Sequence, residues 1–208
     1  MSAYFSVEFQ YTKKDIGKIG KIYNALLACG LKFKSGYYES ENDSWEDIIA
    51  WNQNKFADDF ELGYEEHHSH DYKQMLFDFY DFSEVRLFIL NVHGAAEISF
   101  HLIIPEADLL EDTHLCDIMS KTDKMKWIEQ LAIDMWRQGG ICSIQVGWEG
   151  SECGISMEEM INGIKPIAEP FAIVPSALYR AEWGLEKREI EGDGIFIYNK
   201  EHWYYLSV

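Results

Sequence analysis

Long apolar runs, an export signal and paired cysteines are all missing from this sequence. Crossing a bilayer takes roughly 18 or more consecutive apolar residues. The longest apolar stretches, near 87–90 and 102–104, have only the length of a buried strand. The N-terminus, Met1-Ser2-Ala3-Tyr4, has neither the basic nor the apolar segment of a secretory signal. We therefore expect a cytoplasmic protein that does not bind a membrane.

The cysteines and the known catalytic motifs give no sign of a reaction. The four cysteines contain no CxxC pair, so we expect reduced thiols, with Cys142 in the core, rather than a Cys142–Cys153 disulfide. No GxSxG elbow and no phosphate-binding glycine motif is present. Adjacent carboxylates are more typical of solvated faces than of a catalytic pair when the chain has 36 acidic residues. We expect no catalytic residue and no cofactor.

A histidine cluster, His67, His68 and His70 beside Asp71, is the strongest candidate for a metal site. Zinc needs three or four ligands that converge tetrahedrally. Neighbouring residues of an extended segment point to opposite sides, and no matching Cys/His pair lies elsewhere. We favour a polar surface loop over a metal site.

Positive charge is scarce, and the negative charge is concentrated in one segment. The chain has a net charge of −18, which disfavours direct contact with nucleic acid or with anionic lipid. Residues 39–84 hold 14 carboxylates against Lys55 and Lys73, a net charge of −12, whereas residues 1–38 have a net charge of +4. Charge blocks of this kind are often disordered. This one contains aromatic and aliphatic residues throughout, so we expect it to fold as an outward-facing anionic surface.

The hydrophobic periodicity predicts an α+β fold, in which a mostly antiparallel sheet carries about three to four helices. One domain over residues 1–208 is the simplest organisation, because the chain shows no repeat and no linker. Strands are expected at 5–9, 31–38, 73–82, 85–92, 97–104 and 141–146, with a terminal hairpin at 194–199 and 202–207. Helices are expected at 13–29, 44–59 and 123–138, and a short one follows a capping box formed by Ser156 and Glu159.

The acidic segment is similar in character to bacterial immunity proteins. The similarity lies in Ser44-Trp45-Glu46-Asp47, in Asp58-Asp59-Phe60-Glu61 and in Tyr64-Glu65-Glu66. Such proteins neutralise cognate toxins of contact-dependent or polymorphic secretion systems, commonly by obstructing the toxin's active site. The resemblance implies a non-enzymatic binding protein whose partner is a basic toxin domain, such as a nuclease. The residues that we expect to contact this partner are Glu46, Asp47, Trp51, Asp58, Asp59, Glu61, Tyr64, Glu65, Glu66 and Asp71.

Four alternatives stay open. The acidic segment is also what a solvated face needs in order to keep a protein soluble. The basic first helix could pack against it, internally or in a dimer, and leave less of the surface free. The chain could also be another interaction module, or an enzyme with scattered His and Glu residues. A deep pocket lined by converging His and Glu side chains would favour the enzyme.

Overall fold

The computed structural model describes residues 3–57, 72–92, 94–113, 117–120, 122–149 and 154–199. The strands are β1 (Tyr4–Thr12), β2 (Lys32–Gly36), β3 (Met75–Asp78), β4 (Val85–Asn91), β5 (Glu97–Pro105), β6 (Leu110–Thr113), β7 (Asp117–Ser120), β8 (Ile141–Trp148), β9 (Phe171–Pro175), β10 (Glu186–Ile190) and β11 (Gly194–Tyr198). The helices are α1 (Lys13–Ile16), α2 (Gly20–Ala28), α3 (Trp45–Ala57), α4 (Thr122–Gln138) and α5 (Met157–Ile161).

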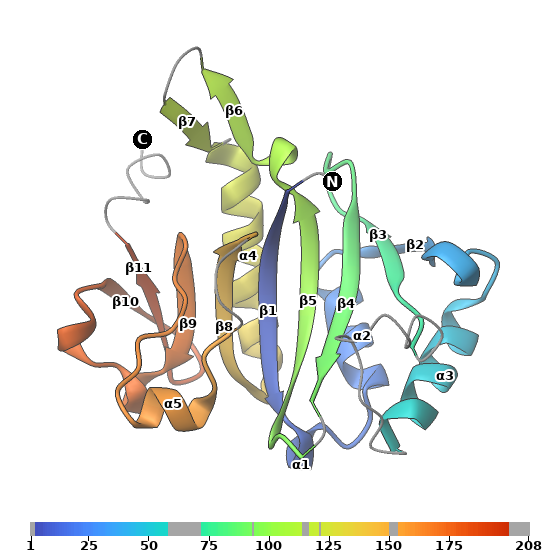
Figure 1. The fold of residues 1–208 in the computed structure, drawn as a ribbon, viewed down its shortest axis with the longest axis horizontal. Helices are drawn as coiled ribbons and strands as arrows, with labels where there is room; N and C mark the ends of the chain where they lie inside the picture. Colours follow the sequence, from blue (N-terminus) through green and yellow to red (C-terminus); the bar gives the residue numbers. More distant parts are fainter. Residues whose placement is uncertain are drawn as a thin grey trace.

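One sheet of nine strands runs through the molecule in the order β10-β11-β9-β8-β1-β5-β4-β3-β2 (Figure 1). Every pair of neighbouring strands in it is antiparallel, and β6 and β7 form a separate hairpin. The predicted α+β class with an antiparallel sheet is therefore confirmed, although the sheet is larger than we expected. The predicted meander appears as β3, β4 and β5. Among the described residues, the helices of substantial length are α2, α3 and α4.

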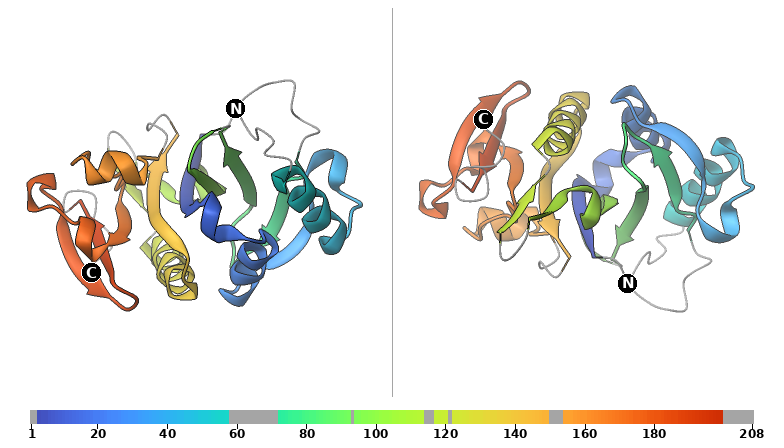
Figure 2. Two further views of the ribbon diagram at one scale, coloured as in Figure 1. Left: turned by 90° about the horizontal axis from the view of Figure 1, so that it is seen from below. Right: turned by 90° about the horizontal axis from the view of Figure 1, so that it is seen from above.

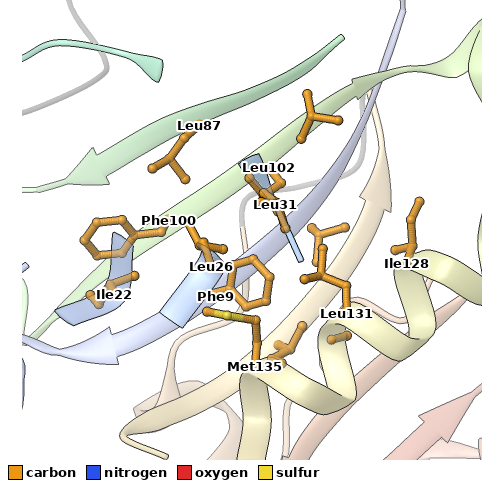
Figure 3. Packing of buried hydrophobic residues seen from close by; sticks show 14 of the residues in the cluster. Phe9, Ile22, Leu26, Leu31, Leu87, Phe100, Leu102, Ile128, Leu131 and Met135 are labelled. Atoms are coloured by element: carbon orange, nitrogen blue, oxygen red, sulfur yellow. The ribbon is translucent and has the colours of Figure 1, made fainter. Parts of the chain in front are cut away.

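The central strand β1 separates two faces of the sheet. Phe5, Val7 and Phe9 are fully buried on the face that α2 and α4 cover (Figure 2). Figure 3 shows Phe9 among Leu26 of α2 and Leu131 and Met135 of α4. The alternation of apolar and polar residues predicted this arrangement, because successive side chains of a strand point to opposite faces. The opposite face lies on the side of α5 (Figure 2). Over β9 and β11 it carries a second buried apolar cluster, which includes Met160 of α5. Over β1 it carries Ser6, Glu8 and Gln10, and we call this part the polar face.

The single helix predicted over 13–29 is wrong, because Gly17 divides it. Gly17 has φ of +58°, which ends α1, and this left-handed region is far more accessible to glycine than to other residues. Gly20 has a different role: a Cβ there would lie 3.3 Å from Ile49 Cγ2 of α3. The basic first helix therefore packs internally against the acidic segment, one of the arrangements that we considered.

Aromatic contacts hold α3 against the sheet. The ring of Trp45 packs edge-on against Tyr23, Phe33 and Phe77, with centroid distances of 5.9, 5.1 and 6.2 Å. The Ser44 hydroxyl accepts a hydrogen bond from the Asp47 amide at 3.2 Å and donates to its carboxylate at 2.7 Å. This is the predicted start of the helix. Its described part ends at Ala57, and the predicted end near residue 59 lies outside the described residues.

The C-terminal strands differ in part from the predicted hairpin. Strand β11 pairs with β10 on one side and with β9 on the other, and neither partner was predicted. The second arm of the hairpin, at 202–207, lies outside the described residues. The capping box of Ser156 and Glu159 is present at the start of α5. In the part of the chain that the structure describes, no helix has the length and apolar character needed to cross a membrane.

A buried amide, Asn52, connects α3 to its surroundings. Its Nδ2 donates to the Tyr23 hydroxyl of α2 at 3.0 Å and to the Lys73 carbonyl at 2.8 Å, and its Oδ1 accepts from the Lys73 amide at 2.7 Å. The side chain has no exposed surface. These bonds fix the chain just before β3 to the helix that carries the acidic residues.

We predict that Asn52→Ala lowers the free energy of unfolding by about 2–4 kcal/mol, because it leaves buried donors and acceptors without partners. Asn54, exposed on the same helix, provides a matched control. Asn54→Ala should change stability by less than about 0.5 kcal/mol. Chemical denaturation of both variants measures the difference, and equal losses would contradict this role for Asn52.

Candidate functional site

The acidic residues around α3 form an outward-facing surface, which we call the acidic face: Glu39, Glu41, Asp43, Glu46 and Asp47 together with Trp51. Of these, Glu39, Glu41, Glu46 and Asp47 are exposed and Asp43 is half-buried. The apolar residues of the same segment point inward, and Ile48 is fully buried. Three of the residues predicted to contact a partner, Glu46, Asp47 and Trp51, therefore lie together on the surface of one helix.

Two lysines modify the acidic face. Lys73 forms an ion pair with Asp43 at 2.6 Å, and its ammonium lies 4.6 Å from the centroid of the Trp51 ring. Lys55 lies 5.4 Å from the same centroid. Trp51 is 40% exposed, yet cations lie near its ring, so it is not an apolar anchor surrounded by carboxylates alone. Asp43 and Lys73 largely compensate each other, and the remaining charge of this face comes from the other four carboxylates.

Most of the other predicted contact residues have no described position. Asp58, Asp59, Glu61, Tyr64, Glu65, Glu66 and Asp71 lie outside the described residues, as do His67, His68 and His70. Within the ranges that are described, no group of three His, Cys, Asp or Glu residues is arranged to hold a metal ion. The prediction for the histidine loop stays a prediction.

The polar face of the sheet holds a second site, which the sequence did not reveal. A pocket of about 310 Å³ lies over β1, β5 and β8 and is closed on one side by Gly154 and Ile167. Phe88 and Tyr4 supply the aromatic rings at the pocket. Trp148 also borders it, but its ring packs on Phe5 at the opposite face of the sheet, with a centroid distance of 4.6 Å. The polar side chains at the pocket are Ser6, Glu8, His101, Gln145 and Glu149.

The register of the strands brings the polar residues of this pocket together. Glu8 of β1 lies directly opposite His101 of β5 on one side and Gln145 of β8 on the other. The Glu8 side chain accepts a hydrogen bond from the Ser99 hydroxyl. His101 Nδ1 lies 3.1 Å from Ser6 Oγ. Its Nε2 lies 4.0 Å from Glu8 Oε1, too far for a hydrogen bond, and has no hydrogen-bond partner among the described residues.

Burial sets the protonation of His101. Loss of hydration lowers the pKa of the imidazole, and the negative charge of Glu8 opposes this effect without overcoming it. The pKa of Glu97, at the other end of the same polar face, is raised by burial, although its carboxylate accepts from the Met157 amide at 3.1 Å. At neutral pH the pocket therefore presents a neutral imidazole beside the Glu8 side chain.

The side-chain amide of Gln145 fixes the segment that closes the pocket to the sheet. Gln145 Oε1 accepts from the amides of Ile155 and Ile167, both at 3.0 Å, and Nε2 donates to the Ile155 carbonyl at 2.7 Å. A Cβ at position 154 would lie 1.9 Å from Glu8 Oε2, so only glycine permits this close approach. Hydrogen bonds within the chain therefore hold this wall of the pocket in place.

The pocket does not have the geometry of a nucleophilic triad, although it contains a serine, a histidine and a glutamate. Strand β1 pairs with β5 and β8 over most of its length, so the backbone amides near Ser6 take part in the ladders and are not available to stabilise an oxyanion. The described thiols are equally unsuited to catalysis. Burial raises the pKa of Cys29 to about 11 and also raises that of Cys142. Both are free and only half-buried, so the prediction of Cys142 as a core residue is wrong.

We predict that His101 makes stability depend on pH. Because its pKa is lower in the folded state, the unfolded chain binds more protons, and the free energy of unfolding falls as the pH drops from about 6.5 through the pKa of the folded state. Nuclear magnetic resonance (NMR) titration of the His101 ring should give a pKa below about 6.5. Glu8→Gln should lower it further, because the variant removes the charge that favours the imidazolium. A rise of this pKa in Glu8→Gln would contradict the arrangement.

The sequence comparisons do not guide the interpretation of either surface. Comparison with models of protein families and with curated protein sequences gives no match. The resemblance to immunity proteins therefore rests on the acidic residues alone, and the roles of the acidic face and of the pocket have to be inferred from their own chemistry.

Proposed function

We propose that the chain is a non-enzymatic binding protein of the immunity type, which acts in the cytoplasm and binds a basic protein partner, such as a toxin domain, through the acidic face. The observation that carries this proposal is the orientation of α3. Its apolar residues are packed against α2 and the sheet, and Glu46 and Asp47 are exposed on the opposite side. The carboxylates thus occupy fixed positions on a rigid element, which is what a preorganised interface requires.

The charge of the acidic face supplies the attraction and the direction of approach. A concentration of one sign of charge steers an oppositely charged partner and raises the association rate, and this effect weakens as salt increases. A toxin that binds nucleic acid needs a basic cleft, and carboxylates on an immunity protein compete there with phosphate. Trp51 would contribute apolar area at the interface, where a tryptophan is a frequent source of binding energy.

The pocket on the polar face supports a different function, because His101, Glu8 and Glu149 converge there. Converging His and Glu side chains are the feature that we expected of an enzyme. The commitment of the β1 amides to the sheet argues against acyl transfer, so the pocket is better suited to binding than to this reaction. We treat it below as a site separate from the acidic face.

We predict that reversing charge on the acidic face weakens partner binding. In Glu41→Lys/Glu46→Lys, both exposed carboxylates change sign while the cap formed by Ser44 and Asp47 is kept. The partner is first captured from the native host with the wild-type protein, identified, purified and tested for toxicity. We expect the dissociation constant to rise by at least about tenfold at low salt, and by less at high salt, because screening removes the effect.

The control carries the same change of charge at another place. Glu186→Lys/Glu189→Lys alters two exposed residues of β10, the strand at the far edge of the sheet. Its affinity should stay within about threefold of the wild type. Equal losses in both variants would indicate only the effect of net charge. A captured partner that is acidic, or that binds the acidic-face variant as tightly as the wild type, would overturn the proposal.

We predict that Trp51→Ala speeds dissociation of the same partner. Removing a partly exposed aromatic side chain at the centre of an interface costs about 1–3 kcal/mol of binding free energy, mostly through the dissociation rate. Tyr80 is the control outside the acidic face. It is 66% exposed, and its ring stacks on that of Trp127 of α4 with a centroid distance of 4.2 Å. Surface plasmon resonance measures both rates. A Trp51 variant with the wild-type dissociation rate would exclude Trp51 from the interface.

A further inference from the structure

We propose that the pocket over β1, β5 and β8 binds a small organic amine, whose ammonium group lies between the Glu8 carboxylate and His101 Nε2 and whose apolar body lies against Phe88 and Tyr4. This inference does not depend on the proposed function of the acidic face, because it rests on other residues and another part of the sheet. Four features of the pocket support it: its charge, its donor and acceptor pattern, its walls and its rigidity.

The described lining of the pocket favours a cation. It contains two carboxylates, Glu8 and Glu149, and neither lysine nor arginine. Glu8 is only 5% exposed, and within the described part of the chain the one cationic partner at ion-pair distance is His101, which burial keeps neutral. A buried carboxylate without a cation is unfavourable, and a positively charged ligand would remove this penalty. Arg86, on the neighbouring strand β4, stacks on Tyr4 and Tyr37 instead.

The spacing of the acceptors suits an ammonium group. When His101 Nδ1 donates to Ser6, Nε2 carries a lone pair, and the two acceptors Nε2 and Glu8 Oε1 then face each other across 4.0 Å. Neither atom can donate a hydrogen bond to the other. A nitrogen with several N–H donors fits this gap at about 2.8 Å from each atom. An anionic ligand would instead meet two acceptors and a like charge.

The walls and the volume of the pocket limit the rest of the ligand. Aromatic faces attract cations and also pack against apolar groups, and Phe88 and Tyr4 at the pocket offer both interactions. The volume of about 310 Å³ is at the small end of the range of about 300–1,000 Å³ for ligand pockets. An amine with one aromatic ring, or with a short aliphatic chain, has a suitable size.

The pocket is also preformed. Gln145 holds the segment from Ile155 to Ile167 by three hydrogen bonds, and the Glu97 carboxylate accepts from the amide of Met157 at the start of α5 at 3.1 Å. A site that does not need to order its own walls loses less conformational entropy when a ligand binds. Gln145 is fully used in this role, which leaves Glu8 and His101 as the groups available to a ligand.

The test compares three ligands of the same shape and different charge, by NMR titration of the full chain. Phenethylamine is a cation, phenethyl alcohol is neutral and phenylacetate is an anion. We expect phenethylamine to shift the signals of His101 and of Phe88 and to bind at least about tenfold more tightly than the alcohol. Phenylacetate should not bind. Equal affinity for the amine and the alcohol, a preference for phenylacetate, shifts elsewhere in the chain or no shifts at all would each overturn the proposal.

Variants assign the charge recognition to Glu8. Glu8→Gln keeps the shape and an acceptor for Ser99, and it should lower the affinity for the amine by at least about tenfold without affecting the alcohol. Glu158→Gln, an exposed residue of α5, makes the same change of charge outside the pocket and should bind as the wild type does. If Glu8→Gln binds the amine as tightly as the wild type, the proposal fails.

A second measurement on the wild type does not depend on any variant folding. A bound ammonium next to Nε2 disfavours the imidazolium, so saturation with phenethylamine should lower the pKa of His101, and phenethyl alcohol should not lower it in this way. A pKa of His101 that is unchanged by saturating amine would place the ligand elsewhere. Because the acidic-face variants leave the pocket intact, they should bind the amine normally, so either proposal can fail without the other.

Discussion

The structure depends on one strand, β1, which lies in the middle of the nine-stranded sheet and is covered on both faces. On one face its phenylalanine and valine side chains form the core with α2 and α4 (Figure 3). On the other, Glu8 and Gln10 are 5% and 4% exposed. An antiparallel sheet commonly leaves one face to solvent. Here the segment after β8 covers this face, so its polar side chains need hydrogen-bond partners within the protein. At the pocket this pairing is incomplete, because His101 Nε2 has no partner among the described residues.

Local patterns were enough to predict the elements whose pattern is long or ends in a clear signal. The stripe of Ile128, Leu131 and Met135 predicted α4, and Gly139 and Gly140, both with φ of +80°, follow its end. The exceptions have physical causes. Gly17 resembles a tolerated residue within a helix until its positive φ is known. Strand β10 is an exposed edge whose residues are mostly charged, so it has no buried face to give a period of two. Strand β9 is a short apolar run, which periodicity cannot assign.

The two sites differ in how much a sequence can reveal. The acidic face is local: its carboxylates and its anchoring residues lie in one segment, so their orientation follows from helical spacing. The position of Lys55 near Trp51 also follows from helical spacing, because it lies four residues further along α3. The position of Lys73 depends on how the chain returns beside α3. The pocket is not local. Ser6, His101 and Gln145 meet only through the register of three strands, which the pattern within any one strand does not specify. One signal was present, because the strands that pair with one another carry polar residues on the same face. The small number of expected helices, however, gave no reason to expect a second layer that covers this face.

The burial of Glu8 bears on why such a pocket exists at all. Stability alone would favour an apolar residue at this position, because burying a carboxylate next to neutral donors costs free energy that an apolar side chain would not. Gly154 approaches its Oε2 so closely that a Cβ would not fit, so the covering segment accommodates the carboxylate instead of excluding it. The Ser99 hydroxyl satisfies one lone pair of Oε1, and the His101 ring stops short of the rest. Local rules of folding are most often broken at functional sites. Such a break occurs at Glu8, a buried acidic residue of the central strand with a pocket beside it and an acceptor of His101 across 4.0 Å. This break is the reason why we assign the proposed ligand to the polar face and not to the acidic face.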